Sequence, residues 1–149
     1  MTVEHLPSVP QGQAHWTPLF GAWLIALLAT AGALFLGEVM GKTPCVLCWY
    51  QRIAMFPLAL VLGLGLLEPD DRCLRYAAPL AWAGWGIAAY HCLIFWGVVS
   101  EGLAPCGQGP SCADADVQVA GIVPIPLLSL IAFSGIVALL WLARRKVKT

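Results

Sequence analysis

The sequence predicts an all-α integral membrane protein, a bundle of four transmembrane helices with both termini in the cytoplasm. Three observations favour this fold. Of the 149 residues, 60% are hydrophobic and only 11% are charged, with a mean hydropathy of +0.80, whereas about 25% of residues are charged in soluble domains. Four apolar runs are long enough for a helix to cross a bilayer, which takes about 20 residues. Lysine and arginine are concentrated in the segments that four crossings place on one side.

We expect the spans at about residues 17–39, 49–67, 74–99 and 122–142. The outer loops then comprise residues of about 40–48 and 100–121, and at this length we expect residues 1–149 to form one domain. The segment before the first run contains no Lys or Arg, and the run exceeds the roughly 7–15 apolar residues of a signal peptide. We therefore expect it to be retained as a helix. Runs of this length are typical of helices and not of the short alternating strands of an outer-membrane barrel.

The cationic residues indicate the orientation of the bundle. With four spans, the middle loop and the C-terminal tail lie on the side of the termini, and together they carry Arg72, Arg75, Arg144, Arg145, Lys146 and Lys148. The opposite side carries Lys42 and Arg52. Because cytoplasmic segments are enriched in Lys and Arg, this bias predicts cytoplasmic termini. Interfacial aromatic residues are expected at the ends of the spans, and the candidates are Trp16, Tyr76 and Trp141 on the inner side and Trp49, Tyr50 and Trp96 on the outer side.

This topology places four of the six cysteines on the outer face, as one pair in each outer loop. Cys45 and Cys48 form a CxxC motif that runs into the second span. Cys106 and Cys112 lie in the second outer loop, where the glycines and the proline between them favour turns. The two pairs therefore face the same compartment.

Three interpretations of these pairs are open. Paired cysteines in an oxidising compartment are by default structural disulfides, although closing the loop from Cys106 to Cys112 contributes only about 2.4 kcal/mol, which a helix bundle hardly needs. A Cys₄ zinc site is disfavoured because the compartment oxidises thiols and because five residues separate the second pair, outside the usual spacing of about two to four. The third interpretation is a redox centre.

The redox interpretation accounts for more of the sequence. Cys48 directly precedes a helical run, so we expect the positive end of a helix to stabilise its thiolate. Arg52, one turn further along the same face, adds a fixed positive charge. His91, in the outer half of the third span, is a functional candidate that could donate a hydrogen bond or a proton to a quinone oxygen, or else a histidine bonded between helices. Cys73 and Cys92 are expected to be an inert thiol and a packing residue.

At this point the segment VMGKTPCVLCWYQR, with one span before it and three after it, resembles the signature region of the DsbB-type disulfide-bond-formation proteins, which are bacterial inner-membrane quinone reductases. The matching features are the proline before the first cysteine, the CVLC core and the arginine four residues after the second cysteine. The resemblance implies a protein-dithiol:quinone oxidoreductase. Such an enzyme would reoxidise a periplasmic DsbA-like dithiol oxidase of thioredoxin fold and pass the electrons to ubiquinone or menaquinone. It also implies that the active cysteines lie on the periplasmic side of the inner (cytoplasmic) membrane.

The resemblance also implies roles for the outer cysteines. Cys106 would exchange with the reduced partner, and Cys112 would complete that pair. Electrons would then pass to the CxxC pair, where Cys48, beside Arg52, would face the quinone. The chain departs from the best-known family members in its short second outer loop, which is similar to that of the compact BdbC-type members. Such a loop favours a local disulfide, and we expect the loop to swing as a unit to reach Cys45.

Two other functions are open on the sequence. One is a non-catalytic membrane protein whose outer cysteines are structural or bind a metal. The other is an enzyme similar to vitamin K epoxide reductase, in which the CxxC motif falls near the last helix, whereas here it follows the first span. Nucleic acid is not an expected partner, since the formal net charge is zero and no basic segment is interleaved with aromatics. The sequence contains no Gly-rich phosphate loop and no GxSxG element, so nucleotide and hydrolase functions lack support.

Overall fold

The protein is described by a computed structural model that covers residues 16–67, 72–100, 111–112, 118–119 and 123–148. The elements are α1 (Trp16–Leu34), the π-helical turn η2 (Phe35–Val39), α2 (Val46–Leu67), α3 (Arg72–Phe95), β1 (Gln118–Val119), β2 (Val123–Pro124) and α4 (Ile125–Lys148). The two short strands pair antiparallel. Within the described residues, four helices are long and apolar enough to cross a membrane. The predicted all-α, four-helix fold is therefore confirmed.

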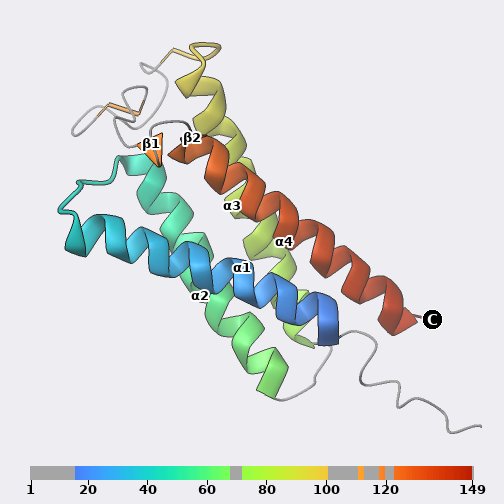
Figure 1. Cartoon of the computed structure of the whole chain (residues 1–149). Coiled ribbons are helices and arrows are strands. Elements are labelled where there is room, and N and C mark those ends of the chain that lie inside the picture. The colour runs from blue at the N-terminus through green and yellow to red at the C-terminus, as the bar shows by residue number, and fades with distance from the viewer. Residues whose placement is uncertain (1–15, 68–71, 101–110, 113–117, 120–122, 149) are drawn as a thin grey trace, which may run out of the picture.

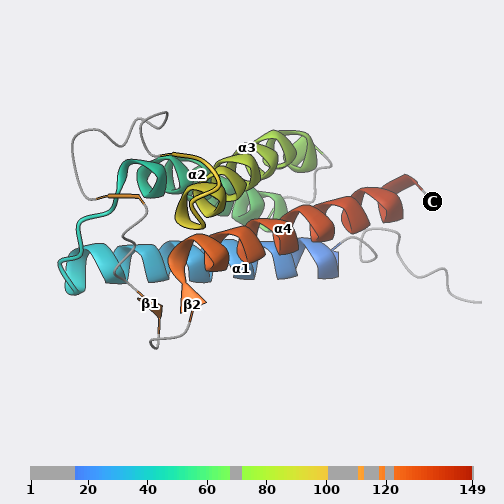
Figure 2. The same ribbon diagram turned by 90° about the horizontal axis from the view of Figure 1, so that it is seen from above.

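The four helices form a bundle in which each helix contacts its two neighbours: α1 packs against α2 and α4, and α3 packs against the same two helices. The chain alternates in direction, so η2, the first turn of α2, the last turn of α3 and the start of α4 meet at one end (Figure 1). The start of α1, the end of α2, the start of α3 and the C-terminus lie toward the other end. Seen from above, α2 and α3 lie on one side of the bundle, and α1 and α4 lie on the other (Figure 2).

Three helix boundaries differ from expectation at the end where the predicted site lies. Helix α3 ends at Phe95, four residues before the expected end near Val99. Helix α2 begins at Val46, earlier than the expected start near Trp49, so Cys48 belongs to its first turn. Helix α4 begins at Ile125, later than expected, because Val123 and Pro124 form β2 and pair with β1.

Small residues bring the helices close together. The fully buried alanines of the core are Ala22, Ala26, Ala77, Ala81, Ala88 and Ala143. Small side chains let helix backbones approach in membrane bundles, where burial of apolar surface from water is not available as a driving force. Gly84 of α3 lies against the ring of Phe133 of α4 so closely that a Cβ atom at position 84 would overlap that ring. At the other end, Arg144 Nη2 donates a hydrogen bond of 2.8 Å to the Leu74 carbonyl.

Large apolar side chains cover the outside of the bundle. Along α2, Leu58 and Leu62 are fully buried, whereas Leu60, Leu64 and Leu67 are each at least 65% exposed. A continuous apolar surface of this kind suits lipid chains and not water. All six candidate interfacial aromatics are exposed, as contact with the membrane interface requires: Trp16, Trp49, Tyr50, Tyr76, Trp96 and Trp141. The orientation of the bundle in the membrane stays a prediction.

Candidate functional site

Cys45 caps the N-terminus of α2. Its carbonyl accepts the hydrogen bond from Trp49 N–H (3.1 Å), and its sulfur accepts one from Cys48 N–H (3.4 Å). This is the N-cap arrangement, in which a side-chain acceptor binds the backbone N–H three residues later. The positive end of the helix macrodipole therefore acts on Cys45, and a negative charge on that sulfur is stabilised.

The two CxxC sulfur atoms lie 3.1 Å apart, within hydrogen-bonding distance and about 1 Å longer than the S–S bond of a disulfide. With the negative charge on Cys45, the Cys48 thiol donates to it. This hydrogen bond is the main reason that the pKa of Cys45 falls from 9.0 to about 4. Burial opposes the shift, and His91 and the Cys48 N–H add smaller contributions that lower the pKa. The hydrogen bonds thus favour the thiolate on Cys45 and not on Cys48, where we expected it. The reason is that the helix begins one residue after Cys45.

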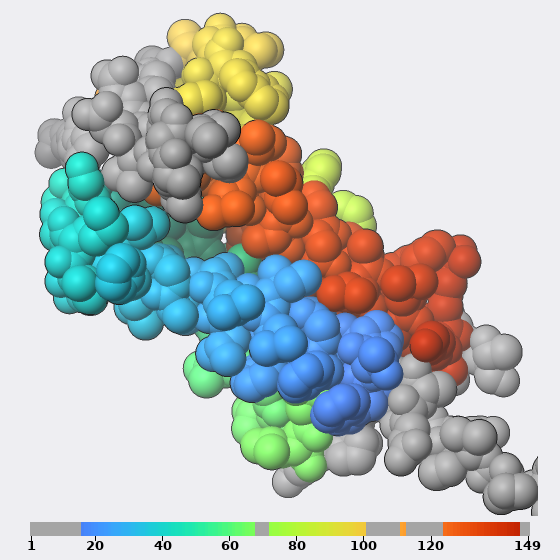
Figure 3. Space-filling view, viewed as in Figure 1, coloured from blue at the N-terminus to red at the C-terminus, as the bar shows by residue number. Residues whose placement is uncertain are grey.

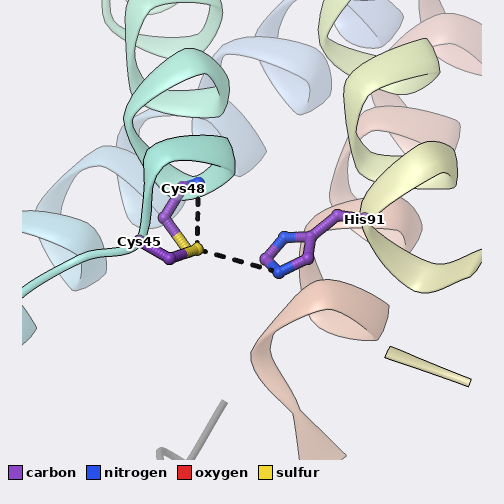
Figure 4. A group of neighbouring side chains, drawn as sticks. All are labelled: Cys45, Cys48 and His91. Atoms are coloured by element: carbon purple, nitrogen blue, oxygen red, sulfur yellow. Dashed lines mark hydrogen bonds between the residues drawn. The ribbon is translucent and has the colours of Figure 1, made fainter. Parts of the chain in front are cut away.

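His91 of α3 points toward the CxxC pair (Figure 4). The imidazole is fully buried, and its Nε2 lies 3.8 Å from Cys45 Sγ and 3.3 Å from the Cys112 carbonyl oxygen. Its Nδ1 lies 3.3 Å from the side-chain amide nitrogen of Gln51. When that amide donates to Nδ1, the proton of a neutral imidazole is on Nε2, where it can donate to the Cys112 carbonyl and toward Cys45. His91 therefore connects α2, α3 and the second outer loop.

Cys112 is already next to the CxxC pair. It is fully buried and packs in one hydrophobic cluster with Cys45, Leu47 and Ile94. Cys112 is disulfide-bonded, whereas Cys45 and Cys48 are free. The expected swing of the loop is therefore not needed to bring Cys112 to Cys45. The predicted site residue Cys106 lies outside the described residues.

Arg52 lies on the far side of the CxxC pair from His91, against the end of the first span. Its Nη2 donates a hydrogen bond of 2.7 Å to the Ala33 carbonyl, and the guanidinium lies 5.5 Å from the centre of the Trp49 ring. Gly37 in η2 makes this approach possible, because a Cβ there would be 3.2 Å from both Nη1 and Nη2. π-Helical turns are rare and occur frequently at functional sites.

A cavity of about 400 Å³ opens beside the pair, within the range of roughly 300–1,000 Å³ that is usual for small-molecule sites. Cys45, Cys48, Gln51, Arg52 and Lys42 line its polar end. Its apolar walls come from three helices and include Ala29, Ala33, Leu36, Met55, Phe56 and Phe133. In the space-filling view, α2 is visible between α1 and the start of α4 at this end of the molecule (Figure 3). The cavity could hold a flat, largely apolar molecule with polar atoms at one end.

The structure thus gathers five of the six predicted site residues at one end of the bundle: Cys45, Cys48, Arg52, His91 and Cys112. His91 does not line the described cavity, so its contacts are with cysteines and not with the space where we expected a quinone. Gln51, which is 5% exposed, is a further polar residue of the site that the sequence analysis missed. The signal was available: Gln51 is an amide in an apolar helix, one turn after Cys48. A Cys₄ metal site is not formed in this state because Cys112 is in a disulfide.

Comparison with known proteins identifies the family of the chain. Residues 15–143 match the family described as "Disulfide bond formation protein DsbB". The chain is 44% identical to a "Probable disulfide formation protein" of Metapseudomonas resinovorans, over 92% of this chain and 95% of the relative. It is 37% identical to the "Disulfide bond formation protein C" of Bacillus subtilis, over 85% and 91% of the two chains. A "Probable disulfide formation protein" of Deinococcus radiodurans is 40% identical, over 88% and 91%. No solved structure matches the chain.

Proposed function

Since this chain belongs to the DsbB family of disulfide bond formation proteins and is a multi-pass membrane oxidoreductase that acts in disulfide formation, we propose the route of its electrons. A DsbA-like, thioredoxin-fold dithiol oxidase delivers them, and a membrane quinone receives them. The chain lies in the bacterial inner membrane, with its termini in the cytoplasm and the CxxC pair on the periplasmic side. Residues 1–149 act as one domain.

The first step is exchange with the soluble partner. A thiolate of the reduced partner attacks Cys106 of a Cys106–Cys112 disulfide, and the second partner thiol completes the exchange. The partner leaves as a disulfide, and Cys106 and Cys112 become thiols. The burial of Cys112 supports this order, because a folded partner protein cannot reach a fully buried sulfur.

The second step passes the two electrons inward. Cys112 attacks Cys45 of the Cys45–Cys48 disulfide and releases Cys48 as the thiolate; Cys106 then attacks Cys112 of the mixed disulfide and releases Cys45. One disulfide is restored in the outer loop and two thiols are formed in the CxxC pair. The packing of Cys112 against Cys45 supports this attack, and the proton on His91 Nε2, 3.8 Å from Cys45 Sγ, stabilises that sulfur as a leaving thiolate.

The cavity fits the head group of a quinone, which supplies a two-electron, two-proton acceptor when bound. Cys48 lies on the cavity wall with Arg52, Lys42 and Gln51, and these three side chains offer N–H donors of the kind that a carbonyl oxygen requires. The apolar walls exclude water and suit the ring. Both cysteines of the pair line the cavity. Because Cys45 belongs to the buried cluster that contains Cys112, we assign Cys48 as the sulfur that faces the acceptor, and Cys45 completes the disulfide when the pair is reoxidised.

One observation carries this proposal: Cys45 shares a buried cluster with Cys112 and, with Cys48, lines the cavity. The test is reduction of ubiquinone-1, or of a menaquinone analogue, by the purified protein in detergent with a reduced DsbA-like partner. Alanine replacement of any one of Cys45, Cys48, Cys106 or Cys112 should abolish turnover. Cys73→Ala is the matched control, since Cys73 lies in the first turn of α3, at the opposite end of the bundle from the site. Turnover that survives Cys48→Ala would refute the proposal.

A second assay separates the two steps. A small dithiol can reduce the CxxC pair directly, so Cys106→Ala and Cys112→Ala should retain quinone reduction with dithiothreitol while they lose it with the protein partner. Loss of both activities in Cys106→Ala would contradict the assigned order, because it would place Cys106 in the inner step.

A further inference from the structure

The reduced CxxC pair and His91 also have the composition of a transition-metal site. One ligand atom from each of Cys45, Cys48 and His91 lies within 4.8 Å of the other two. In a tetrahedral zinc site, bond lengths of about 2.3 Å to sulfur and 2.0–2.1 Å to nitrogen separate neighbouring ligand atoms by about 3.6–3.8 Å. His91 Nε2 lies 3.8 Å from Cys45 Sγ and so already has that spacing. The sulfur atoms, 3.1 Å apart, must separate by about 0.7 Å to reach the S–S distance of such a site.

The surroundings of the three residues suit a bound metal. A metal-bound histidine usually donates its other ring N–H to a neighbour, which fixes the orientation of the ring. Gln51 is that neighbour here, because its amide nitrogen lies 3.3 Å from His91 Nδ1. With Nε2 on the metal, the imidazole proton is on Nδ1. A rotation of the Gln51 amide group by about 180° then places its oxygen where it accepts the hydrogen bond from Nδ1–H. Cys48 lines the cavity, which leaves the fourth position open to water.

We propose that the reduced protein binds one zinc ion through Cys45, Cys48 and His91, and that forming the Cys45–Cys48 disulfide releases it. The dependence of zinc binding on the redox state of the pair follows from the chemistry of the ligands. Thiolates bind Zn²⁺ strongly, whereas the two sulfur atoms of a disulfide carry no negative charge to offer it. Bound zinc occupies both thiolates and therefore prevents their oxidation until it leaves. The inference concerns only the reduced pair and His91, and it does not depend on the proposed partner or quinone.

Cobalt(II) is the probe, because thiolate ligands give Co²⁺ an absorption band in the near ultraviolet and tetrahedral geometry gives bands in the visible. The full-length protein in detergent is reduced, freed of reductant under nitrogen, and titrated with Co²⁺ and then with Zn²⁺ as a competitor. We expect one Co²⁺ per chain with thiolate bands, displacement by one Zn²⁺, and no such bands in the oxidised protein. Absence of thiolate bands at millimolar Co²⁺, or equal binding by the oxidised protein, would overturn the proposal.

Variants identify the ligands. Cys48→Ala, at a partly buried position, should weaken Co²⁺ binding at least 100-fold. His91→Ala removes a direct ligand and should also weaken Co²⁺ binding at least about 100-fold. Because His91 is buried, His91→Gln serves as a second variant that keeps its volume. The double variant Cys73→Ala/Cys92→Ala removes two cysteines that are not proposed ligands and should bind Co²⁺ as the wild type does. Binding that is lost in this double variant but kept in Cys48→Ala would assign the metal elsewhere and refute the inference.

Discussion

The pH dependence of Cys45 alkylation tests the electrostatics of the site directly. Only the thiolate reacts with iodoacetamide. Cys45 has a pKa of about 4 in the folded, reduced protein, compared with 9.0 for an unperturbed thiol. At pH 5 about 90% of Cys45 is thiolate, compared with about 0.01% of an ordinary cysteine, a ratio of about 10⁴. A thiolate of lower pKa is less nucleophilic, and a pKa difference of about five units lowers its rate constant by about 100- to 300-fold.

Combining the two factors gives the expected result. At pH 5, Cys45 should react about 30- to 100-fold faster than the same cysteine in the unfolded chain, whereas at pH 7 the two effects nearly cancel. The diagnostic quantity is therefore the shape of the profile. The rate constant for Cys45 should be flat from about pH 5 to pH 9 in the native protein and should rise tenfold per pH unit in the denatured control.

The assay is alkylation of the reduced protein in a chelating buffer, followed by mass spectrometry of the tryptic peptide from Thr43 to Arg52, whose fragment ions distinguish Cys45 from Cys48. Cys48→Ala removes the main donor to Cys45 and should move the inflection upward by about 1–2 pH units, since a hydrogen bond to a charged group is worth about 1.5–3 kcal/mol. Cys48→Ser keeps a donor and should move it less. A native profile that rises tenfold per unit up to pH 9 would refute this account of the site.

The same shift predicts a pH-dependent stability. The folded-state pKa of Cys45 lies below the unfolded value, so between about pH 4 and pH 9.0 the unfolded chain binds more protons at this group than the folded chain. The contribution of Cys45 to the free energy of unfolding of the reduced protein is therefore fully present above pH 9 and decreases as the pH falls toward 4. Thermal unfolding in detergent should show this trend in the wild type and not in Cys45→Ala. Arg52→Ala should raise the KM for quinone about tenfold or more while it lowers the melting temperature little, because its guanidinium is at a helix end where water can replace the lost contacts; equal losses of protein level and activity would mark it as structural. Gly84→Ala should lower the free energy of unfolding by about 1–3 kcal/mol because the new Cβ overlaps the Phe133 ring, whereas Gly86→Ala, with nothing within 4 Å, should be neutral or slightly stabilising. A C-terminal fluorescent fusion should be bright and a C-terminal alkaline phosphatase fusion inactive in bacteria; the reverse would invert the proposed orientation.

The helices follow from composition, but the start of α2 does not. Apolar runs of about 20 residues fix the existence of each span because lipid requires every backbone hydrogen bond to be made within the segment. The first turn of α2 was misplaced because cysteine is not among the usual N-cap residues. Here the Cys45 sulfur accepts the hydrogen bond that an aspartate or serine oxygen usually accepts at this position, and the sequence pattern does not predict it.

The motif residues of the site were predictable, and the contacts between segments were not. Cys48 and Arg52 are separated by one turn of helix, a spacing that sequence gives directly. By contrast, the contacts of His91 with Cys45, Gln51 and the Cys112 carbonyl depend on how α2 packs against α3 and on where the second outer loop returns. The residues of α2 and α3 that make these contacts are 40 or more positions apart in the sequence. Tertiary packing brings them together, and a local sequence pattern does not predict it.

The cap at the start of α2 has an electrochemical consequence. The hydrogen bond from Cys48 N–H reaches a charged acceptor only while Cys45 is a thiolate, so it stabilises the reduced pair relative to the disulfide. An N-cap interaction of about 1 kcal/mol corresponds to a reduction potential higher by about 20 mV for a two-electron couple. The helix start thereby makes the Cys45–Cys48 disulfide a stronger oxidant toward the outer pair. It also makes the following reoxidation harder by the same voltage, which the final acceptor must supply.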